Sequence, residues 1–283
     1  MMTCDLHTHS IFSDGTDTPT EILTNAMKLG LSAVALCDHN TVDGLPEFLS
    51  AAEGMEIEAI PGAEFSVDYN GIELHLLGLY IPKFFFPLTR LWMEEAAQAK
   101  MQSNIELVAA LNEAGYLIDF DAICSATPNG NFNRSHVARA LTEKGYTSSI
   151  NEAFKTLLAP ERGFYKEPPR ITFWDMLKFL NEIEAVSVLA HPFLQLNEAQ
   201  LTELLPLAKE KGLAGMECLY SLYDDATTEL SFRLAEQFDL KPSGGSDYHG
   251  RSKPGISLGT GKGNLKIPYE WAKELKTSGC NLT

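Results

Sequence analysis

In the first part of the chain, hydrophobic and polar positions follow two patterns, one with the spacing of an α-helix and the other typical of short β-strands. A capping box, Thr18-Pro19-Thr20-Glu21, opens a segment whose apolar residues recur at helical spacing until Gly30. Further elements follow in order: a short buried strand at 33–37, a helix near 45–53, and strands near 57–60, 64–68 and 72–79. Asn70-Gly71 predicts a hairpin between the last two strands. Such alternation of strands and helices is typical of a parallel sheet or an α/β barrel.

The same alternation resumes after residue 171, whereas the section before it differs. The later elements are a helix around 174–180, a strand at 186–190, a helix at 201–211, a strand at 214–219 and a helix at 226–238. Residues 83–170 instead predict a long helix at 88–114 and two more at 135–144 and 150–158, with no strand signal. We therefore predict one barrel, formed by 1–82 and 171–283, and a helical insertion at 83–170. The insertion either caps the active site or is a structural excursion without substrate contact.

Composition indicates a cytoplasmic enzyme without a membrane segment. The chain has 283 residues, 45% of them hydrophobic, and contains no stretch of about 18 apolar residues that would span a bilayer. Its first residues lack the basic and apolar regions of a signal peptide. Five cysteines, odd in number and without a Cys-x-x-Cys pair, indicate reduced thiols.

The net charge of −16 limits which partners the chain can bind. Binding of long nucleic acids needs clustered lysine and arginine, so we expect no DNA-binding surface. Three bound divalent ions would still leave the chain acidic. A phosphorylated substrate must therefore be attracted locally, by metal ions and a few basic side chains. The pattern carries no signal of oligomeric state.

Side chains of the types that bind divalent metals recur along the chain. His7 with His9, and Asp247 with His249, are each spaced by two residues, which places both side chains on one face if the segment is a strand. Three more histidines follow or interrupt apolar runs, so we expect them at strand ends, where α/β barrels gather catalytic groups. Six of the seven histidines belong to the full set of candidates, which is His7, His9, Asp14, His39, Glu64, His75, His191, Asp247 and His249.

The segments that hold these residues resemble the ordered motifs of the PHP (polymerase and histidinol phosphatase) superfamily. They are Asp5-Leu6-His7-Thr8-His9-Ser10, Ser13-Asp14-Gly15, Asp38-His39-Asn40, Pro61-Gly62-Ala63-Glu64, the single His75, Ala190-His191-Pro192 and Gly245-Ser246-Asp247-Tyr248-His249-Gly250. Within the superfamily the chain is most similar to bacterial phosphoesterases that remove the 3′-phosphate from nucleoside 3′,5′-bisphosphates and also trim short RNA from its 5′ end. The resemblance implies a distorted seven-stranded barrel.

The resemblance also implies two or three divalent ions at one site. The first would bind His7, His9, Glu64 and Asp247, the second Glu64, His75 and His191, and the third Asp14, His39 and His249. Imidazole and carboxylate ligands without thiolate suit Mn, Zn or Fe, and they leave the native metal open. A hydroxide shared by the ions would attack a phosphomonoester, with Glu64, Asp247 and His191 acting through the metals that they hold. Asp38, beside His39, is either a hydrogen-bonding partner of the site or a loop or helix-capping residue.

Polar residues of the insertion are candidates for binding a second phosphate. Arg134-Ser135-His136 lies near the start of a predicted helix, where amide groups and a guanidinium favour an anion, and it resembles an Arg-x-His of the phosphoesterase subfamily. Lys166 is a further candidate, although for Lys166 and Arg170 a solvated linker charge fits equally well. The long helix has few cations, which disfavours extended RNA as the main substrate.

Three functions fit these patterns. The leading one is a nucleotide phosphatase, the second a phosphatase for histidinol phosphate or another small monoester, and the third a metal-bound regulatory module without turnover. Because none of the nine ligands is missing, the third is disfavoured. The glycine-rich segment at 259–263 lacks the spacing of a nucleotide-binding loop and a helix after it, so we interpret it as a turn.

Overall fold

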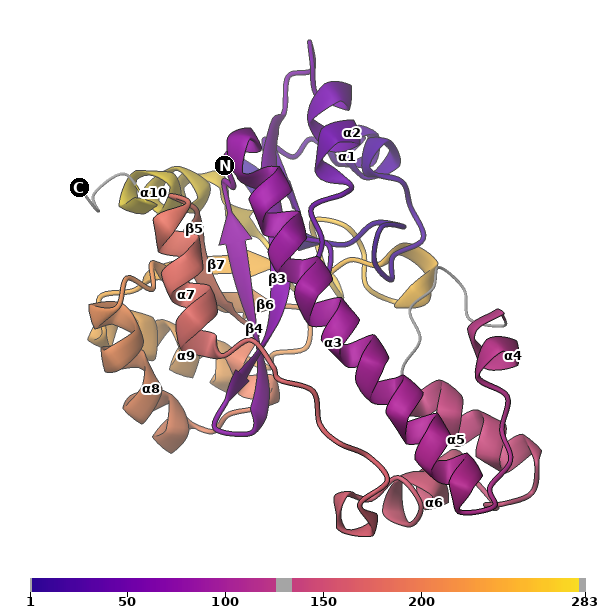
Figure 1. The fold of residues 1–283 in the computed structure, drawn as a ribbon. Helices are drawn as coiled ribbons and strands as arrows, with labels where there is room; N and C mark the ends of the chain where they lie inside the picture. Colours follow the sequence, from indigo (N-terminus) through magenta and orange to yellow (C-terminus); the bar gives the residue numbers. More distant parts are fainter. Residues whose placement is uncertain (1, 126–133, 280–283) are drawn as a thin grey trace. The chain divides into compact units, whose positions relative to one another are not determined.

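The computed structural model describes residues 2–125 and 134–279, which form two compact units (Figure 1). The first unit combines Met1–Leu91 with Ile171–Thr283, and the second is Trp92–Arg170. The long helix α3, Phe86–Glu113, begins in the first unit and continues into the second.

The first unit is a nearly closed barrel, as predicted, with eight strands in its sheet instead of seven. They are β1 (Thr3–Thr8), β2 (Ala33–Leu36), β3 (Glu58–Tyr69), β4 (Ile72–Leu79), β5 (Val186–Ala190), β6 (Gly215–Tyr220), β7 (Lys241–Gly245) and β8 (Ile267–Pro268). Their order is β7-β6-β5-β4-β3-β2-β1-β8, and β4 is antiparallel to both neighbours, as β8 is to β1. Beyond β7, the Asp247 amide donates to the His7 carbonyl at 2.9 Å, which brings the two ends of the barrel together.

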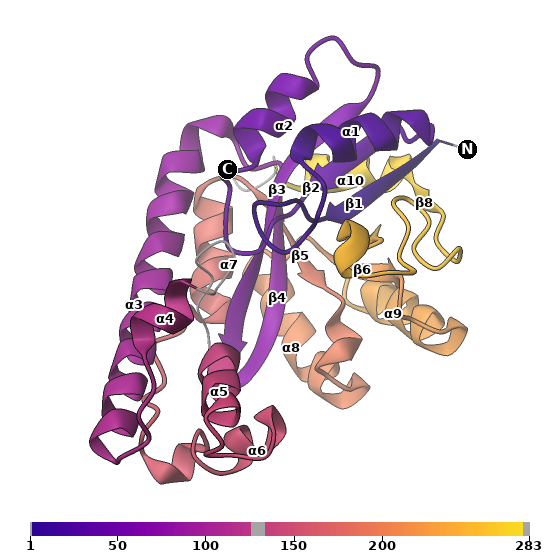
Figure 2. The same ribbon diagram turned by 90° about the vertical axis from the view of Figure 1, so that its right-hand side faces the viewer.

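Helices surround this barrel (Figures 1 and 2). They are α1 (Pro19–Lys28), α2 (Leu45–Ala51), α7 (Phe173–Glu182), α8 (Glu198–Glu210), α9 (Asp225–Gln237) and α10 (Tyr269–Gly279), with short 3-10 turns at Lys83–Phe85, Pro192–Leu194 and Gly250–Ser252. The predicted capping box starts α1, since the Thr18 hydroxyl accepts from the Glu21 amide and the Glu21 carboxylate accepts from the Thr18 amide. Buried Ile22, Leu23 and Ala26 form its inner face.

Apolar side chains fill the inside of the barrel and leave one end for polar groups. Leu6, Ala35, Ile60, Leu77 and Val188, from five different strands, belong to one fully buried cluster. Parallel strands end at the same edge of a barrel, so the loops after β1, β2, β5 and β7 meet beyond this cluster. This apolar cluster therefore fills the barrel on the inner side of these loops.

The strands predicted at 57–60 and 64–68 form a single strand, β3, so the expected break at Pro61-Gly62 is absent. Pro61 pairs with Leu36 of β2, and pairing with β4 starts at Gly62. A Cβ at Gly62 would lie 2.9 Å from the carbonyl oxygen of Gly78. Glycine thus allows the neighbouring backbones to approach where β3 changes partner.

The second unit is helical in its described residues. Besides most of α3 it contains α4 (Phe120–Ser125), α5 (Arg134–Glu143), α6 (Ile150–Lys155) and a 3-10 turn at Pro160–Arg162. Its own core is built from Leu107, Leu111, Val137 and Leu141, among other buried residues. The sequence did not indicate α4.

None of the described helices is both long and apolar enough to cross a membrane.

Candidate functional site

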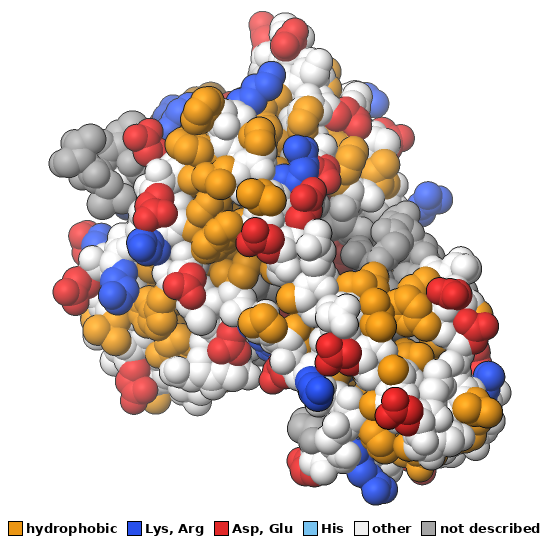
Figure 3. All heavy atoms as spheres, viewed as in Figure 1, with side chains coloured by type: hydrophobic (Ala, Val, Ile, Leu, Met, Phe, Trp, Pro, Cys, Tyr) orange, Lys and Arg blue, Asp and Glu red, His pale blue; other side chains and the backbone are white. Residues whose placement is uncertain are grey.

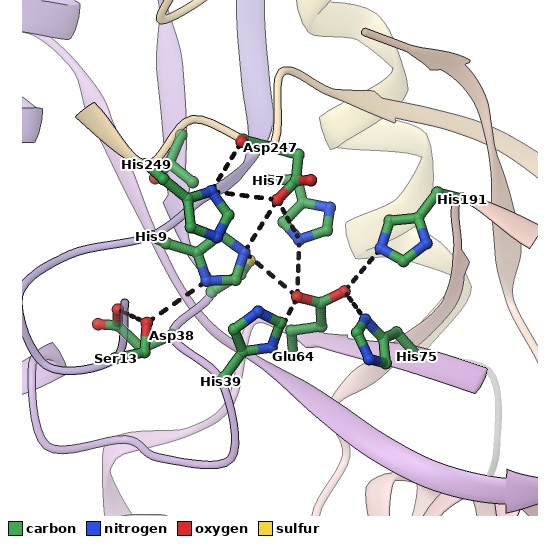
Figure 4. A network of polar contacts seen from close by, with 12 residues as sticks. His7, His9, Ser13, Asp38, His39, Glu64, His75, His191, Asp247 and His249 are labelled. Atoms are coloured by element: carbon green, nitrogen blue, oxygen red, sulfur yellow. Dashed lines mark hydrogen bonds and ion pairs between the residues drawn. The ribbon is translucent and has the colours of Figure 1, made fainter. Parts of the chain in front are cut away.

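The predicted metal ligands of the first unit converge at one end of the barrel, and Figure 4 labels all of them except Asp14. They come from β1 and its following loop, the loop after β2, β3, β4, the loop after β5 and the loop after β7. His7, His9, Glu64, His191, Asp247 and His249 are buried, whereas the Asp14 side chain is 55% exposed. Segments more than 200 residues apart thus supply one cluster.

Glu64 lies at the centre of this cluster. Its Oε2 is 3.2 Å from Nε2 of His7, 3.2 Å from Nε2 of His9 and 3.1 Å from Nδ1 of His39. Its Oε1 is 2.7 Å from Nδ1 of His75 and 2.9 Å from Nε2 of His191. The two oxygens therefore face two different groups of imidazoles.

Two aspartates complete the arrangement. Asp247 Oδ1 lies 3.3 Å from Nε2 of His9 and 3.7 Å from Nε2 of His7. Asp14 Oδ1 lies 3.1 Å from Nε2 of His249 and 3.8 Å from Nε2 of His39. Asp247 thus contacts two histidines of one segment, β1 and the residue after it, whereas Asp14 contacts histidines from two separate loops.

The donor atoms of this cluster fit divalent metal ions. Four groups have donor atoms within 4.8 Å of one another: His7, His9, Glu64 and Asp247; His9, Asp14, His39 and His249; His39, Glu64 and His75; and His7, His191 and Glu217. Among the described residues, His7 Nε2, His9 Nε2, His249 Nε2 and Glu64 Oε2 are buried without a hydrogen-bond partner. Buried polar atoms are rarely left in this state, and cations bound to the first two of these groups would satisfy all four.

The four groups differ in part from the predicted ligand sets. The first contains the predicted ligands of one ion, and the second adds His9 to the predicted Asp14, His39 and His249. Glu64, His75 and His191 do not form one group, although both histidines contact the same oxygen of Glu64.

The environment shifts the pKa of several of these groups. Burial acts to raise the pKa of Glu64, but the charge of His7 and the hydrogen bonds of His191, His7 and His75 hold it well below its usual value. Burial lowers the pKa of His39 to about 3, against the attraction of Glu64. For His75, hydrogen bonds to Glu64 and Glu73 outweigh burial and raise the pKa to about 9. Glu64 is therefore ionised, which is the state in which a carboxylate can bind a cation.

The strand condition stated for Asp247 and His249 is not met, and the expected position of His75 at a strand end is wrong. Asp247 and His249 lie in the loop after β7, not on a strand, and Asp247 has a left-handed φ of 57°. His75 lies inside β4 and not at a strand end. It reaches the site because β4 is antiparallel, so that the first half of β4 lies beside the end of β5, with His75 opposite Ala190.

Polar residues that the sequence did not single out, most of them buried, surround the candidate ligands. Asp5 accepts hydrogen bonds from the amides of Ser246 at 2.8 Å and Gly259 at 2.7 Å, and thereby fixes the loop that carries Asp247. Tyr220 and Lys253 donate to Asp247 Oδ2 at 2.8 and 2.7 Å. Glu217 contacts His7 and the backbone of His191. The detectable signal was a carboxylate within an apolar run, Gly215-Met216-Glu217-Cys218.

Asp38, for which two roles were open, organises the loop after β1. Its carboxylate accepts from the amide and the hydroxyl of Ser10 and from the hydroxyl of Ser13, each at 2.7 Å. Ser13 Oγ in turn lies 3.5 Å from Nδ1 of His9 (Figure 4). Asp38 thus fixes the loop after β1 and is linked to His9 through Ser13.

The predicted substrate contacts of the insertion all belong to the second unit. Arg134, the first residue of α5, lies with its guanidinium carbon 4.1 Å from the ring centre of Tyr165 and 5.9 Å from that of Phe154. Ser135 and His136 follow in the first turn of the helix. Lys166 is 79% exposed and 3.8 Å from a Glu106 oxygen, while Arg170 pairs with Glu167 at 2.5 Å.

Comparison with known proteins identifies one family and several proteins of similar sequence. The family model for the PHP domain matches residues 5–193. The chain is 30% identical over 246 residues to a 5′-3′ exoribonuclease of Haemophilus influenzae, covering 87% of this chain and 89% of that protein. It is 28% identical over 264 residues to a 3′,5′-nucleoside bisphosphate phosphatase of Chromobacterium violaceum, covering 92% and 91%.

A crystal structure from Bifidobacterium adolescentis, described as a metal-dependent phosphoesterase, matches with a TM-score of 0.72 and 26% identity. The match covers 99% of this chain and 98% of that one. Together with the family match and the cluster of metal-binding side chains, it shows that the chain belongs to the PHP family and is a metal-dependent hydrolase of phosphate esters.

Proposed function

We propose that the protein hydrolyses nucleotide phosphomonoesters and that its preferred substrate is the 3′-phosphate of a nucleoside 3′,5′-bisphosphate. The observation that carries this proposal is the position of Glu64, whose two oxygens face five histidines at distances between 2.7 and 3.2 Å. A carboxylate so placed is suited to hold two cations side by side, as in two-metal phosphatases. A relative of similar length carries the name of the same activity.

In this proposal the site holds two or three ions of Mn, Zn or Fe. The ligands are His7, His9, Glu64 and Asp247 for one ion, Glu64, His75 and His191 for another, and Asp14, His39 and His249 for a third. Such ions lower the pKa of bound water towards neutrality and offset the charge of phosphoryl oxygens. Glu64, Asp247 and His191 act in catalysis by holding the metal ions, and therefore their positive charge, in place.

The protein residues supply an environment that favours a phosphate. Burial of Glu64 and His7 keeps water from competing for these two side chains, and the low pKa of Glu64 keeps that carboxylate charged throughout the neutral range. Three carboxylates offset only about half the charge of three divalent ions. The excess positive charge would be neutralised by the substrate.

Surface charge supports a small substrate over extended RNA. On the face drawn in Figure 3, lysine and arginine side chains lie singly among acidic ones. The chain carries 38 acidic and 22 basic residues, so attraction of a long polyanion would be weak. The unpaired thiols of Cys4, Cys37, Cys124 and Cys218 support a cytoplasmic location.

Arg134 would bind the second phosphate of the substrate, helped by Ser135 and His136. The contact with Tyr165 supports this role because stacking on an aromatic ring restrains a guanidinium while its N–H groups stay available. Lys166, largely exposed, would add a further cation for the same phosphate. The helical insertion would then cap the site when substrate binds.

The test is phosphate release by the purified protein after its bound metals have been measured. Adenosine 3′,5′-bisphosphate, histidinol phosphate and a short 5′-phosphorylated RNA are compared, with protein stripped by a chelator as the control. We expect the bisphosphate to have the highest kcat/KM and stripped protein to be inactive. Faster turnover of histidinol phosphate or of RNA would contradict the proposed substrate, and inactivity on all three with metal bound would contradict the proposed reaction.

A further inference from the structure

Glu217 is a buried carboxylate that lies beside the predicted ligands without belonging to them. It is the third residue of β6 and is fully buried between Met216 and Cys218. Its Oε1 is 3.0 Å from Nδ1 of His7, and its Oε2 accepts from the backbone N–H of His191 at 2.7 Å. One side chain therefore contacts a ligand from β1 and a ligand from the loop after β5.

Both oxygens of Glu217 are used by these contacts. A carboxylate only accepts hydrogen bonds, so Nδ1 of His7 must carry the proton. When the His7 ring is neutral, its lone pair then lies on Nε2, which points towards Glu64 Oε2 and Asp247 Oδ1 and has no hydrogen-bond partner among the described residues. That nitrogen is the one that a cation between Glu64 and Asp247 would need.

The second contact acts on the backbone. His191 has a φ of 27°, a conformation that non-glycine residues rarely adopt and that neighbouring contacts must stabilise. The hydrogen bond to Glu217 holds its N–H while the imidazole reaches Glu64. Loss of this bond would free the loop to move the imidazole away.

We propose that Glu217 is a positioning residue that selects the Nδ1-protonated tautomer of His7, fixes the backbone of His191, and so couples two neighbouring metal sites. The proposal rests on the metal-binding part of the proposed function. Carboxylates that accept from a metal-bound histidine raise its basicity and fix its orientation. Here a single carboxylate does this for one ligand ring and for the main chain of another.

The isosteric substitution Glu217→Gln tests this role, because glutamine has one acceptor oxygen and one NH₂ donor. If the oxygen serves His191, the NH₂ faces Nδ1 of His7, whose proton must move to Nε2 and block coordination. If the amide is turned round, the NH₂ faces the N–H of His191. The matched control is Glu58→Gln, since Glu58 accepts from Lys276 at 2.8 Å and Tyr269 at 2.8 Å at the other end of β3.

Metal affinity is measured by competition with a chelating dye for wild type and both variants. We expect Glu217→Gln to bind about 10- to 100-fold more weakly, in line with other partners of metal ligands, and Glu58→Gln to bind like wild type. Wild-type affinity in Glu217→Gln would overturn the inference alone. A wild-type protein that binds no divalent ion would overturn both the inference and the proposed function.

A second measurement needs no variant. The ¹⁵N spectrum of the histidine rings in zinc-loaded wild-type protein reports which nitrogen of each ring carries a proton. We expect His7 to show a protonated Nδ1 and a metal-bound Nε2. A His7 ring that is unprotonated at Nδ1 would overturn the proposal, even if Glu217→Gln fails to fold.

Discussion

At the scale of single residues, the site depends on one carboxylate that contacts many imidazoles. Five histidine nitrogens lie within 3.2 Å of Glu64, and burial excludes water from both of its oxygens. Without a cation, protonated histidines must balance the negative charge of this carboxylate. The raised pKa of His7 and the low pKa of Glu64 both reflect the attraction between the two groups. The role of Glu64 can therefore be tested by removing its charge alone.

We expect Glu64→Gln to lose bound metal and to lower kcat at least ~10³-fold, because an amide supplies one neutral oxygen in place of two oxygens that share a negative charge. Metal content by mass spectrometry and phosphate release from adenosine 3′,5′-bisphosphate are the measurements. Glu58→Gln, on the same strand, serves as the control and should retain both properties. Full activity in Glu64→Gln would exclude a bridging role.

Binding of metal should release protons at pH 7. The pKa of His75 is raised to about 9 and that of His7 is also raised, so both carry a proton that a cation must displace, whereas His39, with a pKa of about 3, is already neutral. Affinity should therefore rise as the pH increases from 7 to 9. Zinc titrations by calorimetry in buffers of different ionisation enthalpy count these protons, and an equal heat in all buffers would refute the prediction.

At the scale of elements, the sequence predicted those parts of the site that follow strong hydrophobic patterns. The strands that precede His39 and His191 are apolar runs, and the helix after Thr18 has a capping box; all three were predicted. The strand β7, Lys-Pro-Ser-Gly-Gly, has no such pattern, so the loop placement of Asp247 could not be foreseen. The antiparallel direction of β4, which determines where His75 lies, depends on pairing with β5, more than 100 residues away.

The glycines of β7 allow close contact with β1, and this contact should be sensitive to a single methyl group. A Cβ at Gly245 would lie 2.1 Å from Cβ of His7 and 2.7 Å from its amide nitrogen. We expect Gly245→Ala to lower the free energy of unfolding by about 1–3 kcal/mol and to weaken metal binding by moving His7.

Urea denaturation and metal titration measure the two effects of Gly245→Ala. The control is Ser243→Ala on the same strand, because the buried Ser243 hydroxyl has no hydrogen-bond partner in the described part of the chain and its removal should cost little. Equal stability and metal affinity in Gly245→Ala and wild type would show that β1 can move without loss of the site.

Helix α5 gives a matched pair of arginines for testing substrate selection. Arg134 stacks on Tyr165, whereas Arg139 lies exposed on the same helix. We expect Arg134→Ala to raise KM for adenosine 3′,5′-bisphosphate about tenfold or more, because one charge-assisted hydrogen bond typically contributes that much affinity. The KM for adenosine 3′-monophosphate should change little. Arg139→Ala should alter neither. Equal effects of Arg134→Ala on both substrates would argue against a second phosphate site.

At the scale of the whole molecule, the PHP barrel brings together candidate metal ligands that lie far apart in the sequence, from His7 to His249. Their chemical types were readable from the sequence, and a resemblance to known motifs supplied their grouping. The supporting residues Asp5, Glu217, Tyr220 and Lys253 were not found, because a hydrogen bond between distant segments leaves no periodic signal in the chain. The sequence therefore predicts the side chains that could bind metal better than it predicts the residues that orient them.

Anomalous X-ray scattering from crystals of the metal-loaded protein tests the central claim most directly. We expect at least two peaks, one on each side of the Glu64 carboxylate and about 3.5–4 Å apart, with His7, His9 and Asp247 around the first and His75 and His191 around the second. A loaded and active protein that shows no peak within coordination distance of Glu64 would contradict the account.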